Sequence, residues 1–198
     1  MAPNLFIIAG PNGAGKSLFS NTLVSSVSEI FDGDKYISQL KQKYPETGSN
    51  ALQDYVNETI FKEAKEKAIK AKESFAFETN FSSPDPTRSL REFKIAGYKT
   101  NLLFIGMNSI EECVQRVSLR VQLGGHKVPE ESIAFNFEHG FANLYRHYHE
   151  FDIVTLFYNP IALEDLDTFP TKILTIENGQ IELYKPQYPE WIEAFLKE

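Results

Sequence analysis

The feature that most constrains this chain is a glycine-rich segment near its N-terminus. It follows a short apolar run, residues 5–9, and reads Gly10-Pro11-Asn12-Gly13-Ala14-Gly15-Lys16-Ser17. The spacing Gly-x-x-x-x-Gly-Lys-Ser is typical of a loop whose backbone N–H groups curl around a phosphate. The helix that starts after the loop adds the positive end of its dipole. We therefore predict that these eight residues bind a nucleotide.

Two side chains at the end of this loop have distinct predicted roles. Lys16 is expected to contact the outer phosphates, and the Ser17 hydroxyl is expected to bind Mg²⁺. A metal ion there neutralises charge that develops while a phosphoryl group is transferred. The motif therefore predicts ATP or GTP together with Mg²⁺ as cofactors, and gives Lys16 a catalytic role as well as a binding role.

Apolar runs alternate with helical patterns along most of the chain. The expected strands are residues 5–9, 29–31, 74–77, 101–107 and 153–157. The expected helices are residues 18–27, 51–72, 88–96 and 109–121, with one more starting at 128–131. An Asn178-Gly179 pair within residues 172–184 predicts a hairpin. The pattern indicates an α/β fold of the P-loop NTPase type, a three-layer sandwich around a mostly parallel sheet, with a small C-terminal hairpin.

Length and composition favour one domain. A chain of 198 residues with 42% hydrophobic content can bury one sizeable core. We expect a single P-loop kinase domain over residues 1–198, in which residues 172–198 form a hairpin and helix appendage. The lone cysteine, Cys113, is expected to be a buried helix-packing residue, because an unpaired Cys mostly behaves as a small hydrophobe.

Net charge and hydropathy indicate which classes of partner and which cellular location to expect. The formal net charge of -7 disfavours nucleic acid as a partner, since phosphate backbones attract clustered Lys and Arg. The N-terminus lacks the pattern of a signal peptide, and no apolar run is long enough to cross a bilayer. We therefore expect a cytoplasmic protein that binds neither nucleic acid nor membrane and acts on a small-molecule acceptor.

An acidic residue after the second expected strand is the candidate catalytic base. Phosphoryl transfer to a hydroxyl needs a carboxylate that orients or deprotonates the acceptor. Asp34 follows the strand 29–31, and ligands of parallel sheets bind at the carboxyl ends of the strands. Asp34 is therefore the predicted base, and Asp32 is the weaker candidate. The alternative is that Asp34 caps a helix starting at Lys35.

A second acidic residue ends the third expected strand. Glu78 follows the apolar residues 75–77 in the manner of a Walker B acid, so it is expected to hold Mg²⁺ through water or to bind the acceptor. Thr79 and Ser82 are candidate hydrogen-bonding neighbours. The alternative is that Glu78 is an ordinary exposed residue.

Two arginines are candidates for contacting the transferred phosphate. Arg116 and Arg120 are four residues apart on one expected helix, so they share a face. The helix leads into Gly124-Gly125-His126, a stretch suited to the hinge of a lid. A guanidinium there can stabilise charge on the transferred group. The alternative for each arginine is a surface ion pair.

Several segments together resemble the zeta-toxin family of P-loop kinases. Besides residues 8–17, they are residues 75–79, Gly97-Tyr98, residues 116–121 and Gly124-Gly125-His126-Lys127-Val128-Pro129. The match spans most of residues 5–160. Many NTPases share the loop, whereas the Gly-Gly-His-x-Val-Pro stretch after paired arginines is much more specific.

The resemblance implies an ATP- or GTP-dependent kinase whose acceptor is a hydroxyl of a nucleotide sugar such as UDP-N-acetylglucosamine. It also implies an antitoxin protein as a partner. Lys16 and Ser17 match the family's nucleotide loop and Asp34 its catalytic base. Glu78 and Thr79 match the acceptor-binding segment, and Arg120 matches a phosphate-contacting arginine. Arg116 is a further candidate for the substrate.

One departure from the family pattern bears on activity. After Gly-Gly-His-x-Val-Pro the family continues with Ile and then two or three arginines, whereas here Ile133 is followed by Ala134-Phe135-Asn136-Phe137. A lid arginine is therefore absent, and nothing in the spacing shows whether Lys127 or Arg146 replaces it. This leaves two hypotheses: an active kinase of zeta-toxin type, or a nucleotide-binding regulator or partner-binding protein with weak or lost transfer activity.

Overall fold

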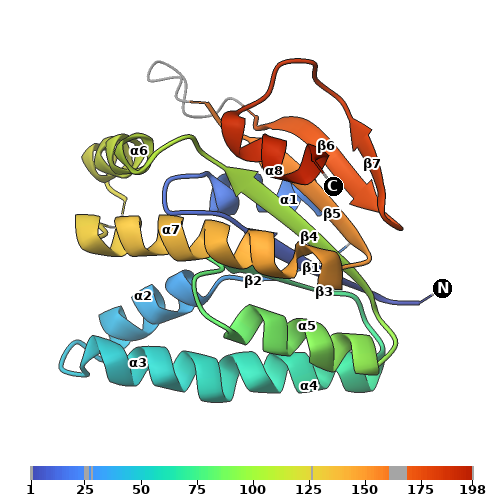
Figure 1. Ribbon diagram of the computed structural model, residues 1–198. Coiled ribbons are helices and arrows are strands. Elements are labelled where there is room, and N and C mark those ends of the chain that lie inside the picture. Colours follow the sequence, from blue (N-terminus) through green and yellow to red (C-terminus); the bar gives the residue numbers. More distant parts are fainter. Residues whose placement is uncertain (1, 25–26, 28, 126, 161–168, 198) are drawn as a thin grey trace.

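The protein is described here by a computed structural model that covers residues 2–24, 27, 29–125, 127–160 and 169–197. Within these residues a seven-stranded sheet has the order β2-β3-β1-β4-β5-β6-β7 (Figure 1). Strands β1 to β5 pair in parallel, and β6 and β7 continue the sheet as antiparallel strands. The predicted mostly parallel α/β fold is confirmed.

The strands are β1 (Asn4–Ala9), β2 (Ile30–Phe31), β3 (Phe75–Thr79), β4 (Lys99–Gly106), β5 (Ile153–Tyr158), β6 (Thr171–Glu177) and β7 (Gln180–Leu183). The α-helices are α1 (Lys16–Leu23), α2 (Gly33–Lys43), α3 (Ser49–Tyr55), α4 (Lys62–Ala71), α5 (Asp85–Ile95), α6 (Ile110–Gln122), α7 (Glu130–His147) and α8 (Glu193–Leu196). No helix among the described residues is both long and apolar enough to cross a membrane.

Helices cover both faces of the sheet, as a three-layer sandwich requires. Alternate residues of β1 point to opposite faces: Leu5 and Ile7 pack in the larger core, whereas Ile8 packs in a smaller core. The larger core also holds buried residues of α4, α5, α7 and α8, and α7 runs across this face in Figure 1. Helix α1 covers the opposite face through Val24 and Leu23. Both faces of the central strands are therefore buried, which accounts for their continuous apolar sequence.

The C-terminal hairpin turns where it was predicted. Asn178 and Gly179 separate β6 from β7 and have φ angles of 53° and 73°. Positive φ at both central residues is the mark of the tight hairpin turn that Asn-Gly favours. The hairpin pairs with β5 through β6, so it extends the central sheet.

The expected helix 51–72 has three parts. Between α3 and α4, residues Val56–Phe61 form a π-helical segment, η1. A π-helical turn places residues five apart on one side. Val56 and Phe61 therefore both face the core, where the Phe61 ring lies 4.8 Å from Phe31 and 5.0 Å from Phe77. The sequence pattern did not separate this segment from α-helix.

Helix α5 begins earlier than the predicted residue 88. The expected start was residue 88, but α5 starts at Asp85, with Pro84 before it and Pro86 in its first turn. Proline is tolerated there because the first N–H groups of a helix have no partner within the helix. Pro86 is a buried start signal rather than part of the loop.

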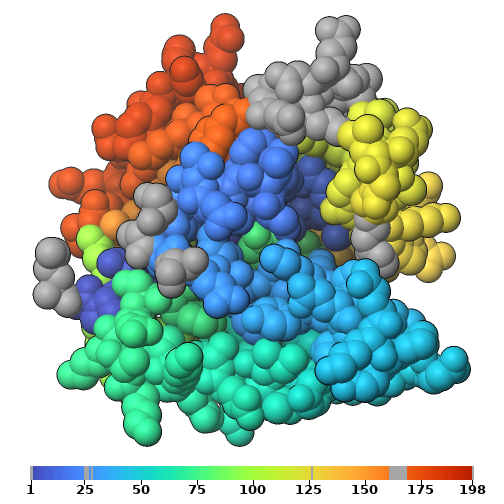
Figure 2. Space-filling view, turned by 180° about the vertical axis from the view of Figure 1, so that it is seen from behind, coloured from blue at the N-terminus to red at the C-terminus, as the bar shows by residue number. Residues whose placement is uncertain are grey.

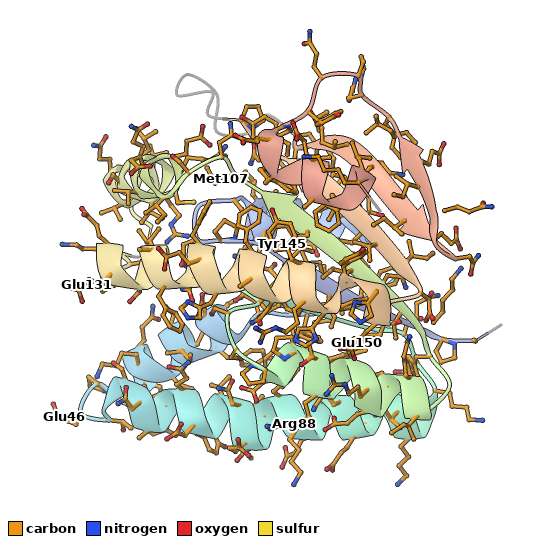
Figure 3. The ribbon with its side chains drawn as sticks, in the orientation of Figure 1. Glu46, Arg88, Met107, Glu131, Tyr145 and Glu150 are labelled. Carbon is orange, nitrogen blue, oxygen red and sulfur yellow. The ribbon has the colours of Figure 1, made fainter. Side chains whose placement is uncertain are left out.

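A carboxylate in the short 3₁₀ helix η2 (Tyr148–Glu150), which directly follows α7, connects this part of the chain to α5. Figure 3 shows Glu150 near one end of α7, above α5, and Glu131 near the other end. The Arg91 guanidinium donates to both oxygens of Glu150, at 2.9 and 3.0 Å, and His147 Nδ1 lies 2.7 Å from Glu150 Oε1. The hydrogen bond from Arg91 holds the pKa of Glu150 at about 2, well below its ordinary value.

We predict that Glu150→Gln lowers the free energy of unfolding by about 1 kcal/mol at pH 7, the scale of a bidentate, partly exposed ion pair. Because the folded-state pKa of Glu150 is depressed to about 2, its contribution is present above the unfolded value of about 4.5 and is lost as the pH falls toward 2. Urea unfolding at pH 7 and at decreasing pH measures the difference, which should shrink in acid.

The matched control is Glu193→Gln, which removes an exposed ion pair with Lys197 on α8. Its effect should be close to zero at every pH. A constant difference between wild type and Glu150→Gln across the acid range would show that the Glu150 charge does not stabilise the junction of α5 and α7.

Candidate nucleotide and acceptor site

The glycine-rich loop connects β1 to α1 at the carboxyl edge of the sheet. Gly10, Gly13 and Gly15 have φ angles of 146°, 84° and 93°. A Cβ at Gly10 would lie 2.3 Å from the Ile105 carbonyl oxygen, and a Cβ at Gly15 would lie 2.8 Å from the Phe19 ring. Only glycine fits at these two positions. The predicted phosphate-binding loop therefore has the backbone its motif demands, directly before the N-terminus of α1.

Lys16 extends over the loop from the first residue of α1. Its Nζ donates to the carbonyl oxygens of Gly10 (2.8 Å) and Pro11 (3.1 Å) and to Asn80 Oδ1 (2.9 Å). Burial lowers the pKa of Lys16, and the nearby carboxylate of Glu78 opposes that shift. The ammonium therefore lies between the glycine-rich loop and Asn80, the residue after β3.

Oxygen atoms from three elements gather beside Lys16. The Ser17 hydroxyl lies 2.6 Å from Glu78 Oε2 and 3.3 Å from Asp32 Oδ2. The buried Ser20 hydroxyl donates to Glu78 Oε1 at 2.8 Å. Burial is the main cause that raises the pKa of Glu78, while the two serine hydroxyls act in the opposite direction. This partly desolvated carboxylate therefore favours a cation next to Ser17.

The oxygen cluster fits Mg²⁺. Hydroxyl and carboxylate oxygens are the ligands that Mg²⁺ prefers, and the ion usually keeps waters and substrate phosphates as further ligands. No group of three or more His, Cys, Asp or Glu that could hold a metal ion is found among the described residues. Among the described residues, Ser17 with Glu78 and Asp32 could hold such an ion, on the pattern of a P-loop serine and a Walker B acid.

The two aspartates after β2 have different surroundings. Asp32 is the N-cap of α2, since its Oδ1 accepts from the Lys35 N–H at 3.1 Å, and its other oxygen faces Ser17. Asp34 lies in the first turn of α2, is exposed and lines the cleft. The alternative that Asp34 caps this helix is wrong, because Asp32 is the cap. Asp34 therefore remains available at the border of the cleft.

Thr79 shapes the loop that follows β3. Its Oγ1 accepts from the Phe81 N–H at 2.9 Å, and the buried Phe81 has a φ of 60°. A bulky residue in the left-handed region is strained, and such strain is typical of functional loops. The contact that Thr79 makes in the structure is therefore one that forms the loop.

The paired arginines line the same cleft at different depths. Arg116 is buried, and its Nη1 donates to the Pro160 carbonyl at 3.2 Å. Burial lowers the pKa of Arg116. Arg120 is exposed one turn further along α6, near the predicted hinge. Gly125 accommodates it, because a Cβ there would lie 2.5 Å from Arg120 Cγ; the hinge residue His126 lies outside the described residues.

Asn136, which with Phe135 stands where the family pattern predicts lid arginines, has an amide with partners on both sides. Asn136 Nδ2 donates to Asn12 Oδ1 at 2.8 Å, and the Ser82 hydroxyl donates to Asn136 Oδ1 at 2.6 Å. Lys127 also lines the cleft. Arg146 lies in the last turn of α7, about 15 Å along the helix from Asn136 at 1.5 Å per residue.

These residues surround one cleft with a volume of about 1800 Å³. Figure 2 shows α1 and α2 side by side in the middle of the face seen from behind, with α6 and α7 in yellow beside them. From the glycine-rich loop the cleft continues past α2 to residues of α3, η1, α4 and α5. The nucleotide loop, Asp34, Glu78 and both arginines therefore border a single space large enough for a nucleotide and an acceptor.

Sequence reasoning missed two polar side chains of this site. Asn80 binds Lys16, and Ser20 binds Glu78, although neither belongs to the loop motif. Both could have been suspected from position: Asn80 directly follows Glu78-Thr79, and Ser20 lies one helical turn after the motif. Asn80 lies 64 residues from Lys16, and Ser20 lies 58 residues from Glu78. The contacts themselves therefore follow only from the pairing of the strands.

Two solved structures that share this fold illustrate the comparison. One comes from the PezAT chromosomal toxin–antitoxin system of Streptococcus pneumoniae, with a TM-score of 0.63 and 16% identity over 98% of this chain and 83% of that chain. Another is the AvrRxo1-ORF1:ORF2 complex with ATP, with a TM-score of 0.64 and 15% identity over 98% of this chain and 63% of that chain. At these identities the likeness shows the fold.

Sequence comparison gives a relative and a family. A protein of Haemophilus influenzae is 26% identical over 129 residues, which are 65% of this chain and 88% of that protein. The family model for the zeta toxin matches residues 1–185. With a P-loop of the required geometry, a carboxylate beside its serine and this family match over nearly the whole chain, the protein belongs to the zeta toxin family.

Proposed function

We propose that this protein is a kinase that transfers the terminal phosphate of ATP or GTP to a hydroxyl of a small molecule. Membership of the zeta toxin family supports a phosphotransferase. The observation that carries the proposal is that Ser17, with its Glu78 and Asp32 partners, shares one cleft with Lys16 and with the exposed Asp34. A nucleotide site and a candidate base for the acceptor thus meet in one space.

The residues of the cleft divide the work of transfer. The glycine-rich loop and Lys16 bind the phosphates, and the helix dipole of α1 adds to the attraction. Ser17 and Glu78 would hold Mg²⁺, which when bound neutralises charge on the phosphates. Asp34 accepts the proton of the attacking hydroxyl, and the exposed Arg120 reaches the transferred group from α6.

The acceptor proposed is a nucleotide sugar such as UDP-N-acetylglucosamine, on the basis of the family resemblance. The size of the cleft supports it, because the cleft extends from the nucleotide loop to α4 and α5. An antitoxin is proposed as the protein partner, since PezAT is a toxin–antitoxin system and the AvrRxo1 structure is a complex of two proteins.

A second candidate function is nucleotide-dependent binding with weak or lost transfer. The observation that favours it is Asn136, an uncharged amide at the position of the family's lid arginine. Loss of an arginine that contacts the transferred phosphate costs roughly 10³ to 10⁵ in rate in well-studied systems. Incubation with Mg-ATP or Mg-GTP and a panel of UDP-sugars, followed by ³¹P detection of product, decides between the two. Nucleotide binding without any phosphorylated product would favour the second function.

We predict that Lys16→Ala abolishes turnover and weakens nucleotide binding, because the loop keeps its N–H groups but loses the ammonium aimed at the outer phosphates. Calorimetric titration with Mg-nucleotide and product detection measure both effects. Lys99→Ala is the control, since it removes an exposed lysine that pairs with Glu177 on β6. Unchanged nucleotide affinity and activity in Lys16→Ala would contradict the assignment of the loop.

We predict that Asp34→Asn leaves nucleotide affinity within a few fold and lowers kcat at least about 100-fold, the usual contribution of a general base. Asp32→Asn is the matched comparison, because Asn also caps helices well and Asp32 faces Ser17 instead. Its main effect should be on the Mg²⁺ concentration required. A parallel loss of nucleotide affinity in Asp34→Asn would assign that residue to the metal or to folding.

A further inference from the structure

One face of α7 contacts the loop that follows β3 at three successive turns. Asn136, Gly140 and Asn143 are spaced by four and three residues, so they lie on one side of the helix. The Ser82 hydroxyl donates to Asn136 Oδ1, and Asn143 Nδ2 donates to the Phe81 carbonyl at 2.8 Å. These contacts of α7 therefore fix residues 80–82, which directly follow Glu78 and Thr79, the residues proposed to bind the acceptor.

Gly140 allows the close approach. A Cβ at this position would lie 2.7 Å from the Asn80 carbonyl oxygen, closer than real Cβ contacts. The backbone of Asn80 thus packs directly on the helix, and its side chain is aimed at Lys16 Nζ, 2.9 Å away. Helix α7 therefore fixes the backbone of Asn80, whose side chain accepts a hydrogen bond from Lys16.

Asn136 adds a direct connection to the nucleotide loop. Its amide lies between Ser82 after β3 and the buried Asn12 in the loop, at 2.6 and 2.8 Å. The two contacts use the donor and the acceptor of one amide. A hydrophobic side chain cannot replace them, because it has neither a donor nor an acceptor.

We propose that Asn136 is a positioning residue that couples the nucleotide loop to the acceptor-side loop through Asn12 and Ser82. As a consequence, nucleotide binding orders residues 79–83 for the acceptor. This consequence rests on the proposed function. Coupling of this kind is reciprocal, so an ordered acceptor loop also favours the nucleotide-bound loop. Asn136 acts through its neighbours and has no charge to offer the phosphate.

The test measures hydrogen exchange of residues 79–83 with and without Mg²⁺ and a nonhydrolysable ATP analogue. In wild type, nucleotide should slow exchange there at least about fivefold, the lower end of usual coupling factors. Asn136→Ala should abolish that slowing while residues 10–17 remain protected. Ser82→Ala, which breaks the same bridge from the other side, should give the same result. Glu138→Ala, on the exposed side of α7, should resemble wild type.

Kinetics with the acceptor found for wild type give the second readout. Asn136→Ala should lower kcat about tenfold with the nucleotide KM within about threefold, as expected when one hydrogen-bonded bridge that orients the loops is lost. The double variant with Ser82→Ala should be no slower than either single variant, because both remove one bridge.

The outcomes separate this inference from the proposed function. Wild-type exchange and kcat in Asn136→Ala, or faster transfer in Asn136→Arg than in wild type, would overturn the coupling role of the amide. If wild type phosphorylates no hydroxyl and the exchange effect still depends on Asn136, the proposed function fails and the coupling stands. If Asn136→Ala does not fold, Ser82→Ala carries the same test.

Discussion

The parallel pairing of β1 with β3 is the constraint on which the rest of the site depends. In this register Ile8 lies opposite Glu78 and Ala9 opposite Thr79. The two strands therefore end together, and the chain that leaves β1 as the glycine-rich loop returns as α1 with Ser17 facing Glu78. A shift by one residue would turn Glu78 to the other face of the sheet and separate it from both serines. The contacts of Glu78 with Ser17 and Ser20 therefore depend on the register between β1 and β3.

Burial shifts the pKa values of two charged residues in the cleft, Lys16 and Glu78. Lys16 and Glu78 are both partly removed from water, and their pKa values move in the directions that burial dictates for a cation and an acid. Each also lies near the opposite charge, which compensates part of the cost. A site of this kind is arranged for ligands that carry charge of both signs, as a nucleotide with its metal ion does.

Helix α7 contacts both loops that border the cleft through the uncharged side chain of Asn136. The family's arginine is absent, yet Asn136 sits between the two loops that border the cleft and contacts both. The neighbouring Gly140 and Asn143 follow the same face of the helix and contact the same loop. In this segment α7 therefore joins the two loops by hydrogen bonds, whereas the family pattern has charged arginines there.

The sequence by itself determined the local features, because these depend on residues close together in the chain. The loop motif, the apolar strands and the Asn-Gly turn predicted the loop backbone, the sheet and the hairpin, and Glu78 was chosen as a candidate from its place at the end of the apolar run 75–77. The tertiary structure decided which distant groups meet: Asn80 with Lys16, Ser20 with Glu78, and Asn136 with Asn12. It also assigned the helix cap to Asp32 and left Asp34 facing the cleft. No local pattern contains these contacts, since strand order, register and the close packing of α7 at Gly140 create them.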